Sequence, residues 1–310
     1  MYRFSMRDHR QDVTFEVRRT RCAGVLFLPE RAEGKLPAVV LAHGFSGTMD
    51  RLFDVAAGFA EVGFAALLFD YRRFGASGGE PRQVVDVDDQ LEDFAAAIAF
   101  ARAHPRIDPD RVAAWGNSLG GGHAVVLAAR DPRIAAVIAQ IPFNGFPKAV
   151  EGRSAKDAWR LMGAMLSDGL RGVLGLPPKL IPMVGVPGTV AVTALPDAQR
   201  HLELLRGEST TWRNEVAPRG LLKMMWYRPG KSAPRVRSPL LVCVAAEDRV
   251  TPEKLTRPIA ERAPRGELKR YAGGHFDFYN APHIRRQVMA DQLEFLRRHL
   301  SPAGAGAEPA

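Results

Sequence analysis

A serine lies inside the pentapeptide Gly116-Asn117-Ser118-Leu119-Gly120, between an apolar run at 111–115 and a stretch rich in Gly and Ala. A serine at such a strand-to-helix turn is held in the strained geometry of a nucleophile elbow, with its hydroxyl exposed at the edge of a sheet. Glycines at both ends fit this geometry, because a side chain there would collide with the neighbouring strand or helix. The pentapeptide alone is also compatible with an ordinary turn serine, so the assignment depends on residues elsewhere.

A serine hydroxyl becomes nucleophilic only when a positioned base takes its proton and a carboxylate orients that base. Asp248 follows the apolar run 240–245, and His275 follows the strand expected at 268–271. The carboxyl ends of parallel strands share one edge of a sheet, so these groups can converge there. The sequence therefore predicts Ser118 as nucleophile, His275 as base and Asp248 as its orienting carboxylate.

Other roles are open for several of these residues and their neighbours. Glu247 is the alternative orienter, and Asp248 could instead cap the helix expected from about residue 252. His43 fits a residue that props a loop better than it fits a base. The aromatic residues that flank the expected crevice would either wall an acyl pocket or belong to the core, and these are Phe143, Phe146, Phe276, Phe278 and Tyr279. The other histidines show no metal-ligand spacing, so no metal site is expected.

The elements that must position these groups alternate between strands and helices. Strands are expected over 12–17, 22–28, 38–42, 64–69, 111–115, 134–140, 239–245 and 268–271. Helices are expected over 50–62, 84–103, 120–130, 252–262 and 282–299. Apolar strands that alternate with helices are typical of a mostly parallel sheet covered on both faces, so the fold class is α/β.

The alternation stops between 143 and 235, where Gly, Pro, Met and Trp follow in irregular order. We expect a cap at 143–235, inserted between two core parts at 1–142 and 236–300, and a disordered tail at 301–310. The uncharged run 180–196 is shorter than a membrane span and contains three prolines, so it is expected to line or fill the cap. No integral membrane span is expected.

Composition excludes some classes of function. The net charge is +9, yet no stretch combines clustered Lys and Arg with aromatic residues, so nucleic acid is not an expected partner. Residues 151–235 hold 13 basic and 7 acidic residues, and attraction of an acidic substrate or carrier to this region is one hypothesis. Cys22 and Cys243 lie in expected strands and give no disulfide framework. The first ten residues lack an apolar segment, which favours a cytoplasmic protein.

Five motifs in this order resemble the α/β-hydrolase superfamily, most closely its capped serine carboxylesterases near the dienelactone hydrolase and Xaa-Pro dipeptidyl-peptidase-like branches. They are His43-Gly44-Phe45, Asp70-Tyr71-Arg72 with Gly75, Ser77 and Gly79, the elbow at 116–121, the loop with Asp248, and Gly274-His275. The resemblance covers 13–142 and 236–299. The nucleophile of dienelactone hydrolases is cysteine, so this chain departs from them. The resemblance implies an oxyanion hole made by the backbone N–H groups of Phe45 and Leu119.

The predicted function is cleavage of a small-molecule carboxylic ester or thioester through a Ser118 acyl-enzyme, without a cofactor. The alternatives are an acyltransferase that passes the same acyl group to an alcohol or amine, an Xaa-Pro-type peptidase, and a non-catalytic binding protein. The sequence leaves open a homo-oligomer, and also whether Arg72 or Arg73 contacts a substrate carboxylate or pairs with a surface acid.

Overall fold

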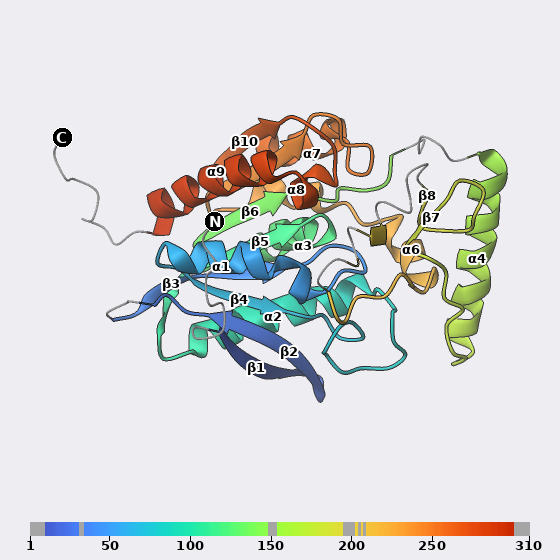
Figure 1. The fold of residues 1–310 in the computed structure, drawn as a ribbon, viewed down its shortest axis with the longest axis horizontal. Coiled ribbons are helices and arrows are strands. Elements are labelled where there is room, and N and C mark those ends of the chain that lie inside the picture. The colour runs from blue at the N-terminus through green and yellow to red at the C-terminus, as the bar shows by residue number, and fades with distance from the viewer. Residues whose placement is uncertain are drawn as a thin grey trace.

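The computed structural model describes residues 10–30, 34–147, 154–194, 202–203, 206 and 209–300. Within them, eight strands form one sheet in the order β1-β2-β4-β3-β5-β6-β9-β10 (Figure 1). The strands are β1 (Arg10–Val17), β2 (Thr20–Phe27), β3 (Leu36–Ala42), β4 (Ala65–Phe69), β5 (Ile107–Asn117), β6 (Ala136–Gln140), β9 (Leu240–Ala245) and β10 (Gly266–Tyr271). The pairs β1–β2 and β2–β4 are antiparallel, and the remaining pairs are parallel. The expected mostly parallel sheet is confirmed.

Helices cover both faces of this sheet, as expected from its apolar strands. They are α1 (Phe53–Glu61), α2 (Val87–Ala103), α3 (Leu119–Ala128), α7 (Glu253–Arg262), α8 (Asp277–Asn280) and α9 (Pro282–Leu300). Successive side chains of a strand point to opposite faces. In β3, accordingly, Val40 packs in the core layer with α2, α3 and α7, whereas Val39 and Leu41 pack in the layer with α1 and α9. Both layers are apolar, and together they fix the sheet that carries the site.

The segment between β6 and β9 contains α4 (Ala155–Val173), two short strands β7 (Val184–Gly185) and β8 (Thr193–Ala194), and α6 (Arg219–Met224). Figure 1 shows α4 at the outer edge of the molecule, beyond α6. The buried carboxylate of Asp168 joins them, because it accepts bonds from Arg219 Nε at 2.8 Å and Nη2 at 2.9 Å and from the Lys179 amide at 2.8 Å. The outer face of α4 leaves large apolar side chains exposed, and these are Trp159, Leu166, Leu170 and Val173.

Some element bounds differ from the expected ones. Helix α2 begins at Val87 rather than at 84, because the Asp86 side chain caps it by accepting the amides of Asp88 at 2.9 Å and Asp89 at 3.2 Å. Strand β5 extends over Ile107–Asn117, and the one-turn helix α8 was not expected. The first nine residues and the tail expected at 301–310 lie outside the described residues. In the part that the structure describes, no helix is long and apolar enough to cross a membrane.

Candidate active site

Ser118 occupies a strained turn between β5 and α3. Its φ of 53° and ψ of −114° lie outside the regions that L-residues favour. The flanking glycines allow this turn: a Cβ on Gly116 would lie 2.0 Å from the carbonyl oxygen of Gly120. A Cβ on Gly120 would lie 2.5 Å from the carbonyl oxygen of Ala42 and 2.6 Å from that of His43. Both positions therefore exclude side chains, as the sequence predicted.

Backbone hydrogen bonds lock this turn in place. The Ser118 amide donates to the Gln140 carbonyl at 2.9 Å. The Ser118 carbonyl accepts from the amides of Gly122 at 3.1 Å and Phe143 at 2.8 Å. The strain at Ser118 is thus held by the ends of β5 and β6 and by the first turn of α3, which leaves the side chain facing a cavity.

His275 and Asp248 are brought together by the loops after β10 and β9. The Nδ1–H of His275 donates to Asp248 Oδ2 at 2.8 Å, and both side chains are buried. Glu247, the alternative orienter, is exposed. The structure therefore places Asp248, not Glu247, against the histidine.

The Asp248 carboxylate is surrounded by donors. Oδ1 accepts from the amides of Val250 at 2.8 Å and Thr251 at 2.7 Å, and the Thr251 hydroxyl lies 2.9 Å from Oδ2. Burial acts to raise the pKa of Asp248, but His275 and these hydrogen bonds lower it below its usual value. Helix α7 begins later, at Glu253, so the alternative of Asp248 as its cap is wrong.

Thr251 is a residue that the sequence analysis missed. Besides contacting Asp248, its hydroxyl lies 3.1 Å from the Ile141 carbonyl and 3.2 Å from His275 Nδ1. Its single proton can serve one acceptor at a time.

The two candidate oxyanion donors flank Ser118. Leu119 is the first residue of α3, where amides lack a partner within the helix and the dipole favours negative charge. Phe45 follows β3, and a Cβ on the adjacent Gly44 would lie only 3.1 Å from Ser118 Cβ. Residues Phe45, Leu119, Ser118 and His275 line the same cavity. The donor positions expected from the resemblance therefore stand beside the candidate nucleophile.

His43 supports this loop rather than reaching Ser118 as a base. Its Nδ1 donates to the Gly44 carbonyl at 2.9 Å, and Nε2 lies 3.8 Å from Asp70 Oδ1. Burial lowers the pKa of His43 to about 4 and raises that of Asp70 to about 6. Asp70 in turn accepts the amides of Met49 and Ala76, each at 2.8 Å. A neutral His43 is thus a fixed part of the loop.

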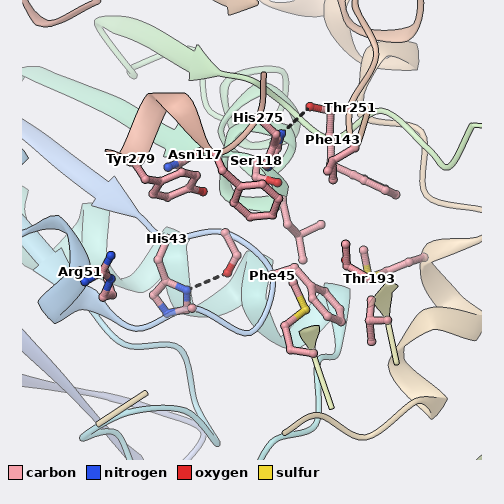
Figure 2. Close-up of a pocket in the computed structure, with 18 of the residues that line it drawn as sticks. His43, Phe45, Arg51, Asn117, Ser118, Phe143, Thr193, Thr251, His275 and Tyr279 are labelled. Atoms are coloured by element: carbon pink, nitrogen blue, oxygen red, sulfur yellow. Dashed lines mark hydrogen bonds between the residues drawn. The ribbon is translucent and has the colours of Figure 1, made fainter. Parts of the chain in front are cut away.

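The cavity has a volume of about 410 Å³ and opens over Ser118 (Figure 2). Of the five aromatic residues expected at the crevice, Phe143, Phe146, Phe276 and Tyr279 line it. Phe278 does not: it is buried and packs edge-to-face on Tyr271, so it belongs to the core. From the segment between β6 and β9, Met183, Val192, Thr193 and Ala194 also line the cavity, as expected for part of 180–196.

Arg72 and Arg73 do not line this cavity. The Arg72 guanidinium is buried and bonds the carboxylate of Asp93, and Arg73 pairs with Asp89 at 2.6 Å. Of the two roles left open, pairing with acids is the one that the structure shows. The arginines that line the cavity are instead Arg51 and Arg249. Sequence reasoning missed Arg51 because the residue lies in an ordinary amphipathic stretch.

His123 lies under the elbow on α3 and is fully buried. Its Nε2 donates to Gln90 Oε1 at 3.1 Å and its Nδ1 accepts from the Tyr227 hydroxyl at 2.8 Å. Burial lowers the pKa of His123 to about 3. It is therefore a neutral packing residue.

Among the described residues, no group of three or more His, Cys, Asp and Glu side chains could hold a metal ion. Cys22 and Cys243 are buried free thiols, as expected from their strands, and burial raises the pKa of each to about 12.

Comparison with known proteins gives consistent matches. The family model described as serine aminopeptidase, S33, matches residues 35–281. The quorum-quenching protein AidA of Acinetobacter baumannii (strain MDR-ZJ06) is 41% identical over 289 residues, which are 93% of this chain and 94% of that protein. A polyketide transferase of Stachybotrys chlorohalonatus is 30% identical over 271 residues, 85% of this chain and 89% of that one. The crystal structure of the α/β hydrolase GrgF from Penicillium superposes with a TM-score of 0.78 at 24% identity, over 94% of this chain and 99% of that chain.

Proposed function

The chain belongs to the serine aminopeptidase S33 family of α/β hydrolases, and from this premise we propose that it cleaves a carboxylic ester or thioester through an acyl-enzyme on Ser118. The observation that carries the proposal is the His275–Asp248 hydrogen bond of 2.8 Å, in the wall of the cavity that the strained Ser118 faces. A buried histidine oriented by a carboxylate is the base that a serine nucleophile requires.

In the acylation step, Ser118 Oγ attacks the substrate carbonyl carbon while His275 Nε2 takes the hydroxyl proton. Asp248 holds Nδ1 protonated, so Nε2 is the free base, and balances the imidazolium charge. The carbonyl oxygen becomes an oxyanion, which the amides of Phe45 and Leu119 stabilise. Each such donor lowers the activation barrier by roughly 3 to 4 kcal/mol. The C–O or C–S bond then breaks, and the leaving oxygen or sulfur takes the proton from Nε2.

In the deacylation step, a water molecule gives a proton to His275 Nε2 and attacks the Ser118 ester. The second tetrahedral intermediate collapses, and Ser118 Oγ recovers its proton. Charge appears and disappears only on the oxyanion and the imidazole.

The segment 143–235 serves in this proposal as the cap. Its residues Met183, Val192, Leu221 and Met224 complete the cavity with apolar surface. An apolar acyl chain fits this lining, because burial of each methylene contributes about 0.8 kcal/mol. The proposed location of the protein is the cytoplasm. Its two buried cysteines are free thiols, which agrees with a compartment that keeps thiols reduced.

Acyl transfer is the second candidate, and the polyketide transferase relative favours it. The same acyl-enzyme would then be attacked by an alcohol or amine in place of water. The quorum-quenching relative adds the signal molecules of bacterial quorum sensing to the substrates worth testing.

The test is turnover of 4-nitrophenyl esters of increasing acyl length by the wild type and by Ser118→Ala. We expect turnover that requires Ser118 and rises with acyl length until the cavity is filled. Product analysis with added alcohols and amines separates transfer from hydrolysis. Equal turnover by the wild type and Ser118→Ala would refute the acyl-enzyme.

A further inference from the structure

The cavity has two unlike walls. Figure 2 shows Phe45, Phe143 and Thr193 on one side of Ser118, and His43, Arg51 and Tyr279 on the other. The first wall is mainly apolar and is completed by residues of the segment between β6 and β9. The second presents a guanidinium and a phenol hydroxyl. An acyl chain uses the first wall, and the second has no role in the proposed mechanism.

The Tyr279 hydroxyl is a hydrogen-bond donor directed into the cavity. Burial raises the pKa of Tyr279 far above its ordinary value, so the phenol stays protonated. The Asn117 amide hydrogen-bonds the same hydroxyl and lowers that pKa slightly, which makes Asn117 the donor in their contact. The hydroxyl proton of Tyr279 is then left for another acceptor. Figure 2 shows the hydroxyl on the side of the Tyr279 ring that faces Ser118.

This hydroxyl is close to the reacting atoms. A Cβ atom added to Gly44 would lie 3.1 Å from Ser118 Cβ and 3.6 Å from the Tyr279 hydroxyl oxygen. The two side chains therefore border the same small space. Tyr279 also follows His275 by one helical turn, with 6.3 Å between the two ring centroids. The alcohol or thiol that leaves the acyl carbon must lie next to His275, which protonates it. Tyr279 is therefore on the side of the leaving group.

Arg51 gives this wall a positive potential. Burial lowers the pKa of Arg285, and the charge of Arg51 lowers it further. Asp54 pairs with Arg285, and burial lowers the pKa of His43 and keeps its ring neutral. An anion bound beside Arg51 would reduce the repulsion between the two guanidinium groups.

We propose that Arg51 and Tyr279 form a subsite for a carboxylate carried by the non-acyl part of the substrate. A guanidinium binds a carboxylate through two parallel N–H bonds, and the phenol supplies a third donor. The substrate class is then an apolar acyl group joined, through an ester or thioester, to an alcohol or thiol that bears a carboxylate. In acyl transfer the same subsite would hold a carboxylate on the acceptor. The inference rests on the proposed function.

The test compares two octanoate esters with chromogenic leaving groups, 4-nitrophenol and 3-hydroxy-4-nitrobenzoate, of which the second carries a carboxylate. We expect the ratio of their kcat/KM values, carboxylate ester over neutral ester, to fall about tenfold or more in Arg51→Met, mainly through KM, since a charged hydrogen bond is lost. Tyr279→Phe lowers the same ratio less. Arg51→Lys, which keeps the charge but loses the planar fork, gives an intermediate ratio and serves if Arg51→Met does not fold.

Arg249→Met is the matched control, because Arg249 also lines the cavity and its loss changes the net charge equally. An unchanged ratio in Arg51→Met, or an equal fall in Arg249→Met, overturns the subsite. If both esters are cleaved through Ser118 but Arg51 does not affect their ratio, the subsite fails and the proposed function stands. If neither ester is cleaved through Ser118, the proposed function fails and the subsite with it.

Discussion

At the scale of single residues, hydrogen-bond donors fix the orientation of the Asp248 carboxylate. Two amides and the Thr251 hydroxyl hold it while it accepts from His275. A carboxylate fixed in this way needs no reorganisation when the imidazole becomes charged. Thr251 is accordingly a positioning residue, which acts on Ser118 through Asp248 and His275.

Replacing Thr251 by Val keeps the shape and removes the hydroxyl. We expect kcat to fall roughly tenfold, the effect of one charge-assisted hydrogen bond, whereas Asp248→Asn lowers kcat about 10⁴-fold by favouring the wrong imidazole tautomer. The loss in Thr251→Val should depend on pH, because the hydroxyl stabilises the ionised Asp248. Thr189→Val, at an exposed hydroxyl bonded to the Val186 carbonyl, is the control. A pH–kcat profile of Thr251→Val equal to that of the wild type would exclude the role.

Buried neutral His123 makes stability depend on pH. The pKa of His123 is about 3 in the folded protein, below its unfolded value near 6.5, so the unfolded chain binds more protons between these values. Its contribution to stability is present above pH 6.5 and is lost as the pH falls toward 3. Between pH 7 and pH 5 the wild type should lose about 2 kcal/mol of unfolding free energy relative to His123→Gln.

Urea unfolding at both pH values measures that difference, with His283→Gln at an exposed position of α9 as the control. A difference between the wild type and His123→Gln that does not change with pH would mean that His123 titrates alike in the folded and unfolded protein.

The sequence could predict the three candidate catalytic residues because each directly follows a strand, and strand ends meet at one edge. It could not predict Arg51 or Thr251. Their roles arise from side chains that meet only after β3, β9 and β10 have assembled, and neither residue belongs to a motif of its own.

At the scale of elements, the turn from β5 to α3 sets how closely the helix approaches the sheet. A Cβ at Gly120 would overlap the carbonyl oxygens of Ala42 and His43 at the end of β3, and neither can move without shifting the strand. Because Gly120 has no side chain, the start of α3 can lie this close to β3, and this position also fixes Leu119.

Gly120→Ala should lower the unfolding free energy by about 1 to 3 kcal/mol, the usual effect of overpacking, and should lower kcat because the Leu119 amide moves. Gly163→Ala is the control, since Gly163 lies in α4 with nothing within 4 Å of a Cβ. There the substitution should raise stability by about 0.5 to 1 kcal/mol. Denaturant unfolding and ester turnover of both variants give the comparison, and equal effects would contradict it.

Periodicity predicted the existence of the core elements well and their ends less well. The continuous apolar runs could be assigned as strands rather than helices. The start of α2, in contrast, depends on the Asp86 cap, and α8 is only a single turn after His275. Such ends are decided by individual side-chain bonds, which propensity does not describe.

At the scale of the whole molecule, the net charge of +9 has a testable effect on binding of the proposed substrates. An anionic ester should be attracted by the field of the protein and by Arg51, and salt screens this attraction over about 8 Å at physiological ionic strength. Raising NaCl from 50 to 500 mM should lower kcat/KM several-fold for the carboxylate ester and leave the neutral ester nearly unchanged. Stopped-flow or steady-state rates across the salt series test this, and equal salt dependence of both esters would refute it.

The boundaries of the inserted segment and a homo-oligomer stay predictions. Composition located the segment because the alternation of strands and helices stops there. It could not show that Asp168 and Arg219 join α4 to α6, since these residues are about 50 positions apart.

The order of the sheet has a last consequence. Strand β6 pairs directly with β9, although the whole segment 143–235 separates them along the chain. Ser118 therefore comes from one contiguous piece of polypeptide, and Asp248 and His275 come from another, and the contact between the pieces is made by the sheet rather than by the covalent link. The pairing of β6 with β9 predicts that a protease nick inside the segment leaves two chains that stay associated, with the three candidate catalytic residues still in place. Neither piece alone holds all three residues. We therefore expect each fragment to be inactive by itself and the activity to return when the two fragments associate.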